Sequence, residues 1–167
     1  MAPLSGMLPF VVRPGEGLSG PVGATGTIHK IPGDATQGRL AIVEHVLPPR
    51  FLASPIHRHS REDEVSIVLA GALAVKLGDD VVVASEGSYV LKPRGQWHAC
   101  WNAGDTELRF VELIVPAGLE AYFERLSRLR PSPPSDAAEM RSLADEYGLQ
   151  FDFKSVEAVC QQFGLRY

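Results

Sequence analysis

From residue 8 to about residue 116 the chain is divided into short apolar or alternating runs, which are separated by Gly, Pro and Asp. The β-branched content of these runs and their regular punctuation favour strands over helices. Gly78, Asp79 and Asp80 favour a tight turn, so a hairpin is predicted there. The predicted strands are 8–12, 24–31, 39–47, 64–77, 80–87, 88–93, 98–103 and 107–116. Many short strands with frequent turns predict an all-β sandwich or barrel rather than a βαβ sheet.

The character of the sequence changes after Pro116. Apolar residues of the segment 117–129 fall on one helical stripe, and the prolines that follow end this helix. A second helix is predicted over 136–148, a short extended piece over 149–153 and a last helix over 156–163. The residues expected to cap and end the last two helices are Ser135, Gly148, Ser155 and Gly164.

The C-terminal part of about fifty residues is too small to form a separate domain with its own core. We therefore expect one domain, in which residues 1–116 form the barrel with its N-terminal strands. Residues 117–167 form a helical extension that packs on the outside of this barrel or against a second subunit.

Charge and hydropathy exclude several classes of partner. The net charge of −4 provides no basic surface for nucleic acid or for an anionic membrane. The sequence has no run of eighteen apolar residues and no basic segment before its first apolar patch, so neither a spanning helix nor a secretory signal is expected. Cys100 and Cys160 lie far apart. We expect a cytoplasmic protein with reduced thiols that acts on a small molecule.

Two histidines one residue apart occur in "PIHRHSREDE", residues 55–64. On a strand, His57 and His59 point to the same face at roughly 7 Å from each other, where both imidazoles can reach one metal ion. Glu64 opens the next apolar run and can return to the same ion, although Glu62 and Asp63 compete for this role. The alternative is a solvated strand end with two hydrogen-bonded histidines.

A second cluster, "GSYVLKPRGQWHACWN", favours the metal interpretation. Pro93 fixes φ and Gly95 tolerates positive φ, so the segment 87–102 is predicted to form a strand, a tight turn and a returning strand. His98 lies just inside the returning strand, where the turn can present it to the face that carries His57 and His59.

Together these clusters resemble the paired motifs of the cupins. The first has the form H-x-H-x4-E-x6-G and the second the form G-x5-P-x-G-x2-H-x3-N; they are read at His57, His59, Glu64, Gly71, Gly87, Pro93, Gly95, His98 and Asn102. The resemblance departs at Phe51, where the family often has glycine. It implies a double-stranded β-helix (jelly-roll) barrel in which His57, His59, Glu64 and His98 hold one divalent metal ion per chain.

Three imidazoles and a carboxylate suit Fe, Mn, Ni, Co, Cu or Zn, and the absence of a thiolate argues against a closed structural zinc site. Four protein ligands leave one or two positions for water, substrate or oxygen. By strand parity, the metal-facing side should also carry Ser66, Val68, Cys100 and Asn102, mainly as barrel filling, whereas Ala99 and Trp101 should face away. His29 and His45 are interpreted as structural, and Trp97 and Tyr89 as core or interface residues.

Within the cupins, the chain resembles bacterial quercetin 2,3-dioxygenase-like proteins. The similar segments include "KPRGQWHACWNAG", "IVPAGLEAYFERL" and "ADEYGLQFDF". This likeness implies an oxidoreductase acting on a flavonol or a similar enolisable phenol, with Glu64 as metal ligand and general base, and a homodimer. The alternatives are an oxygenase for another substrate, a non-oxidative metal enzyme such as a polyketide cyclase, and a small-molecule-binding cupin without turnover.

Overall fold

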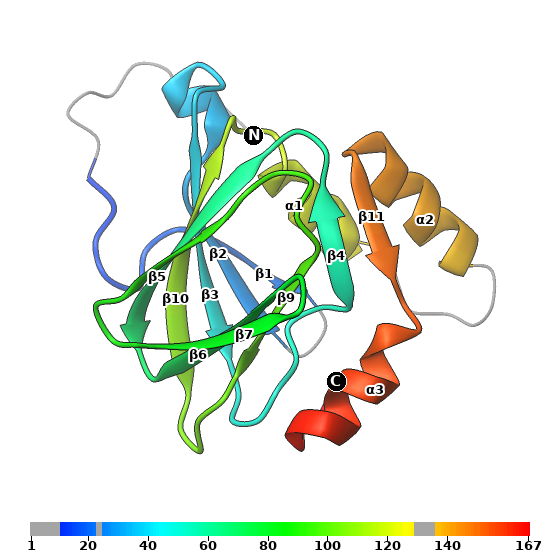
Figure 1. The fold of residues 1–167 in the computed structure, drawn as a ribbon. Coiled ribbons are helices and arrows are strands. Elements are labelled where there is room, and N and C mark those ends of the chain that lie inside the picture. The colour runs from blue at the N-terminus through cyan, green and yellow to red at the C-terminus, as the bar shows by residue number, and fades with distance from the viewer. Residues whose placement is uncertain (1–10, 23–24, 129–135) are drawn as a thin grey trace.

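The structure of the protein is a computed structural model that describes residues 11–22, 25–128 and 136–167. Two antiparallel sheets face each other and form a jelly-roll barrel (Figure 1). One sheet has the order β1-β2-β3-β10-β5-β8 and the other the order β11-β4-β9-β6-β7. The all-β class and the jelly-roll barrel, with helices at its C-terminal end, are therefore confirmed.

The bounds of the elements follow the chain order. The strands are β1 Leu18–Val22, β2 Thr25–Ile31, β3 Ala41–Leu47, β4 Ile56–His59, β5 Asp63–Ala70, β6 Ala72–Leu77, β7 Asp80–Ser85, β8 Tyr89–Lys92, β9 His98–Asn102, β10 Leu108–Val115 and β11 Leu149–Asp152. The helices are the 3-10 helix η1 Gly33–Thr36, α1 Glu120–Arg128, α2 Asp136–Glu146 and α3 Ser155–Phe163. Among the described residues, no helix is long and apolar enough to cross a membrane.

The predicted strands between residues 24 and 116 are present, with one adjustment. The run 64–77 is divided at Gly71, which has a φ of +88° and lies where a Cβ would come within 2.9 Å of the Glu107 carbonyl oxygen. The strand β1 was not predicted, because its sequence LSGPV has no apolar alternation. Of the predicted strand 8–12, residues 8–10 lie outside the described residues and residues 11 and 12 are in no strand. The hairpin turn is confirmed, since Leu77 pairs with Asp80.

Inward-facing side chains form layers along the barrel. The deepest layer is an apolar cluster of buried residues: Leu47, Val68, Leu73, Val75, Ala84, Val90, Cys100, Leu108 and Phe110. Next to it lies a polar layer of buried residues: His45, Glu64, Ser66, Lys92, His98 and Glu112. Because side chains alternate along a strand, Val43 and Ala41 continue the inward row of Leu47 and His45 towards the open end of the barrel.

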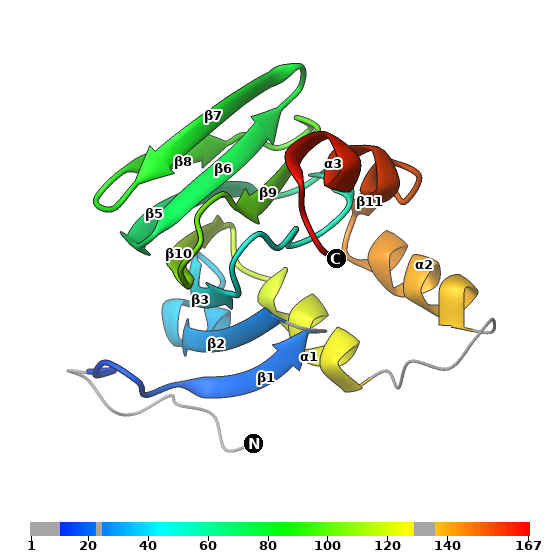
Figure 2. The same ribbon diagram turned by 90° about the horizontal axis from the view of Figure 1, so that it is seen from below.

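The C-terminal elements cover two different surfaces. Leu119 just before α1, Tyr122 of α1, Leu143 of α2 and Leu149 of β11 pack on Val43 and its neighbours and cover this end of the barrel. In contrast, α3 covers the outer face of the second sheet (Figure 2). There Trp101 packs on Phe163 with ring centroids 4.6 Å apart. Ala99 and Trp101 thus face away from the barrel interior, as predicted.

The predicted helix ends at Gly148 and Gly164 are confirmed, whereas the predicted N-cap at Ser155 is wrong. Gly164 ends α3 in the left-handed conformation, and Gly148 follows α2 with a φ of +71°. Ser155 was expected to cap α3 but is its first residue. Its hydroxyl accepts a hydrogen bond from the Ile56 N–H and donates one to the Asp152 carbonyl, which ties α3 to β4. The expected cap Ser135 lies outside the described residues.

Candidate metal centre

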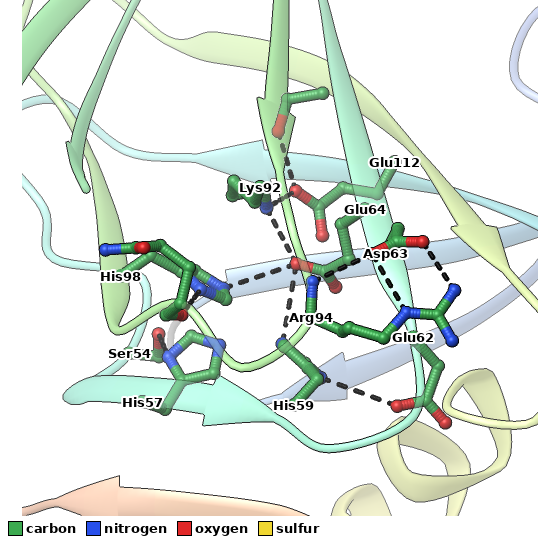
Figure 3. Close-up of polar contacts among 12 residues, drawn as sticks. Ser54, His57, His59, Glu62, Asp63, Glu64, Lys92, Arg94, His98 and Glu112 are labelled. Atoms are coloured by element: carbon green, nitrogen blue, oxygen red, sulfur yellow. Dashed lines mark hydrogen bonds and ion pairs between the residues drawn. The ribbon is translucent and has the colours of Figure 1, made fainter. Parts of the chain in front are cut away.

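The three predicted histidine ligands come together on neighbouring strands of one sheet. His57 of β4 is directly opposite His98 of β9, and His59 lies two residues along β4 on the same face. Their ligand atoms all lie within 4.8 Å of one another. Figure 3 shows the three imidazoles turned towards a common space, with Glu64 beside them.

Backbone and side-chain partners fix the tautomers of two of these rings. Nδ1 of His57 lies 2.9 Å from the Pro55 carbonyl oxygen, and Nδ1 of His98 lies 2.9 Å from the Gln96 carbonyl oxygen. Because a carbonyl only accepts hydrogen bonds, Nδ1 carries the proton in both rings, and Nε2 keeps a free lone pair. Nε2 of His98 is buried and has no hydrogen-bond partner among the described residues, and neither ring nitrogen of His59 has one. These unsatisfied lone pairs fit a metal ion.

Burial keeps two of the histidines in the form that binds a metal. Desolvation, together with the neighbouring His98 and His59, lowers the pKa of His57 well below its usual value. Desolvation also lowers the pKa of His59. His57 and His59 are therefore expected to be neutral at pH 7, and a metal ion need not displace a proton from them.

Glu64 supplies an ionised carboxylate next to two of the histidines. Its Oε2 lies 3.4 Å from Nε2 of His98 and 3.5 Å from Nε2 of His59. The same oxygen lies 2.9 Å from Nζ of Lys92. Burial alone would raise the pKa of Glu64, but the ammonium group of Lys92 lowers it well below its usual value. Three imidazoles thus meet at one space, and the Glu64 carboxylate lies beside two of them without belonging to the group of three.

The competing carboxylates lie elsewhere. Asp63 pairs with Arg94 on the surface at 2.6 Å, and this partner lowers the pKa of Asp63 to about 2. Glu62 is buried, with its Oε2 4.0 Å from Nδ1 of His59, on the side of that ring away from Glu64. Of the three acidic residues, Glu64 is therefore the one placed to share an ion with the histidines.

A buried lysine is the part of the site that sequence reasoning missed. Lys92 is 2% exposed and pairs with Glu64 on one side and Glu112 on the other. Desolvation opposes its charge, but the carboxylates of Glu112 and Glu64 raise its pKa above the usual value. Ser66 donates a hydrogen bond of 2.8 Å to Glu112. The sequence did contain a signal for this buried pair, because Lys92 and Glu112 occupy inward-facing positions in otherwise apolar strands.

His45 extends the polar layer. Its ring stacks on Phe110 at 5.1 Å, and its Nε2 lies 3.9 Å from Oε2 of Glu112. Desolvation and the nearby Lys92 lower the pKa of His45 to about 4. Like His29, it lies apart from the three clustered histidines.

The other residues expected on the inner face fill or fasten the barrel. Val68 and Cys100 belong to the deep apolar cluster, and burial raises the pKa of the Cys100 thiol to about 12. The amide of Asn102 donates to the carbonyls of Leu47, Pro48 and Thr106 and accepts from the Gly104 N–H. Tyr89 was interpreted as a core or interface residue. It is not in the core, since its side chain is 72% exposed. The Arg58 guanidinium lies over the ring of Trp97, 4.8 Å from the ring centroid.

Comparisons with known proteins agree with this fold. Residues 43–115 match the family model described as "Cupin domain". The structure of KdgF from Halomonas sp. is 18% identical, with a TM-score of 0.55, covering 62% of this chain and 92% of that one. A predicted oxalate decarboxylase from Thermotoga maritima is 23% identical, with a TM-score of 0.58, covering 64% of this chain and 99% of that one. No curated protein matches the chain.

Proposed function

We propose, from the premise that the barrel of this chain is a cupin domain, that it binds one divalent transition metal ion and acts as a dioxygenase. The proposed ligands are His57, His59, His98 and Glu64. The observation that supports this proposal is the cluster of three histidines, whose ligand atoms lie within 4.8 Å of one another beside an ionised carboxylate. The proposed substrate is a flavonol or a similar enolisable phenol.

The metal ion, which the donor set allows to be Fe, Mn, Ni, Co, Cu or Zn, would supply a Lewis-acidic or redox-active centre with open positions. Glu64 supplies the base in this proposal. Its carboxylate is ionised, and one oxygen faces His59 and His98, where it can accept the proton of a substrate hydroxyl. Lys92 holds this oxygen at 2.9 Å and so fixes where the proton is taken up. The deep apolar cluster behind the polar layer excludes water from one side.

Metal content tests the proposed site first. Protein purified without added metal should contain Fe, Mn, Co, Ni or Cu near one equivalent, and a His98→Ala variant should lose it. His29→Ala is the matched control, since His29 is a strand histidine outside the cluster. Absence of metal from the wild type after reconstitution with several ions would contradict the proposal. The four residues would then be a polar pocket in a binding protein.

Oxygen consumption tests the reaction. The metal-loaded protein should consume oxygen when quercetin is added, and Glu64→Gln, which keeps the shape of the side chain, should lose most of this turnover. Unchanged turnover in Glu64→Gln would refute the role of Glu64 as base. Conversion of a phenolic substrate without oxygen would instead indicate the non-oxidative alternative, such as a polyketide cyclase.

We also propose a homodimer that uses the outer face of β5 and β8. Three apolar side chains on this face are exposed: Leu69 at 41%, Tyr89 at 72% and Leu91 at 57%. Large exposed apolar patches are typical of protein contact surfaces. Sedimentation should show a dimer, and Leu91→Lys should convert it to a monomer.

A further inference from the structure

The strand β11 belongs to the C-terminal extension, yet it lies beside the candidate metal centre. It pairs antiparallel with β4, so that Phe151 is directly opposite His57 and Leu149 is opposite His59 (Figure 1). This strand lies outside residues 43–115, the segment that matches the cupin domain. The extension therefore adds side chains to the site that the barrel alone does not have.

Phe151 places an aromatic ring against the first histidine. The ring centroids of Phe151 and His57 are 5.3 Å apart, with an angle of 31° between the planes. On its other sides Phe151 contacts Phe153 at 5.4 Å and Tyr122 at 6.4 Å. Because Tyr122 is only 5% exposed, the ring of Phe151 rests on a fixed aromatic support.

The backbone around Phe151 is also held in place. The Ser60 N–H donates a hydrogen bond to the Gly148 carbonyl at one end of β11, and the Ser155 hydroxyl accepts one from Ile56 beyond its other end. The Arg58 guanidinium donates to the side chain of Gln150 at 2.8 Å. A ring fixed in this way contacts a ligand with little loss of conformational entropy.

The residues around the candidate site differ in how much of their surface is exposed. His59 and His98 are 3% and 1% exposed, whereas His57 and Phe151 both keep partial exposure. The histidines are buried as a cluster, and His57 is the one of the three that keeps some exposed surface, beside Phe151. A ligand that binds from the side of His57 contacts the ring.

We propose that Phe151 is a specificity-determining residue that stacks on the planar aromatic part of the ligand, while an anionic oxygen group of that ligand binds at the three histidines. This inference rests on the proposed metal site and, within the proposed substrate class, assigns the contact with the aromatic ring to Phe151. Offset or tilted aromatic pairs contribute to affinity beyond their buried area, and an aliphatic ligand lacks this contribution.

Two metal chelators with the same binding group provide the test. Benzohydroxamate and acetohydroxamate differ only in a phenyl against a methyl group, and their Kd values for Co²⁺-loaded protein are measured by calorimetry. The ratio of the Kd of acetohydroxamate to that of benzohydroxamate should be about three to ten times larger in the wild type than in Phe151→Leu. This is the range that an aromatic pair contributes to affinity. Phe163→Leu is the matched control, because Phe163 packs on Trp101 under α3. It should keep the wild-type ratio.

Equal ratios in the wild type and Phe151→Leu would overturn the inference, as would a wild-type protein that holds Co²⁺ but binds neither chelator. Cobalt content is measured in each variant, because a loss of cobalt would show that Phe151 only supports His57. If Phe151→Leu does not fold, Phe151→Met fills a similar volume without a ring and carries the same expectation. The chelator ratio does not depend on oxygen, so a failure of the dioxygenase proposal in the quercetin assay is distinguished from a failure of this one.

Discussion

The substitution Lys92→Met removes the only cation placed between two buried carboxylates in the described part of the barrel. With Glu64 and Glu112 both ionised, Lys92 brings the sum of the three charges to −1, and burial together with the neighbouring Glu64 raises the pKa of Glu112. Methionine is close to lysine in length and has no charge. In the variant the two carboxylates lie in the interior without a counter-ion, unless one of them takes up a proton or a metal ion binds.

The size of the effect follows from the geometry. At 2.9 Å and an effective dielectric constant of about 20, the attraction between Lys92 and Glu64 is about 6 kcal/mol. Desolvation of both groups offsets part of it, and removal of one partner from a buried pair usually costs about 3–5 kcal/mol. For a chain of this size, each kcal/mol corresponds to about 2–4 °C in Tm, so metal-free Lys92→Met should melt roughly 6–20 °C below the wild type.

Calorimetry or circular dichroism of the metal-free proteins measures this difference. The double variant Lys92→Met/Glu112→Gln is the control, because it restores a charge of −1 and should regain much of the lost stability. A metal ion near Glu64 replaces the missing cation, so Co²⁺ should raise the Tm of Lys92→Met more than that of the wild type. The reasoning is refuted if Lys92→Met loses less than about 1 kcal/mol, or if the double variant is no more stable than the single one.

Three further substitutions test other parts of the structure. The pKa of His45 is about 4, below its unfolded value, so its contribution to stability is present above pH 6.5 and is lost as pH falls towards 4. Measured by urea unfolding, the loss of stability between pH 6.5 and pH 4 should be about 3 kcal/mol smaller in His45→Phe than in the wild type. Equal losses in the two proteins would contradict this expectation. Asn102→Ala should lower the free energy of unfolding, measured with urea, by about 2–3 kcal/mol, because buried carbonyls lose their hydrogen-bond donor. A loss below about 0.5 kcal/mol would refute this. Gly71→Ala should lower the Tm more than Gly87→Ala, since both glycines have positive φ but only Gly71 faces a close backbone oxygen; the opposite order would contradict it.

The barrel could be predicted because its strands carry local signals. Alternating apolar residues, Gly-Asp turns and β-branched runs identify β5 to β10 without tertiary information. The strand β1 has glycine and proline instead of alternation, and it is a strand because β2 pairs with it. The cap at Ser155 failed for a similar reason, since its hydroxyl bonds to Ile56, which is distant in sequence.

The histidine cluster could be predicted in part, because strand parity determines two of its three members. His57 and His59 share a face through a period of two. The strand after Pro93 and Gly95 was expected to return beside β8, but it crosses to the other sheet, where His98 lies opposite His57. Phe151 could not be placed in the same way. Its position beside His57 depends on the pairing of β11 with β4 across more than ninety residues, and no local pattern specifies that register.

The polar layer raises a question that stability alone does not answer. Buried ion pairs are often less stabilising than apolar residues of the same volume, and the deep cluster shows that this barrel can be filled with apolar side chains. Lys92, Glu112 and Ser66 nevertheless form a connected network that ends at the oxygen of Glu64 facing His59 and His98. A network that fixes one carboxylate oxygen is useful where the position and charge of that oxygen matter for chemistry. The arrangement holds the Glu64 carboxylate in one position and keeps it ionised beside the histidines, which is what the proposed metal site requires of it.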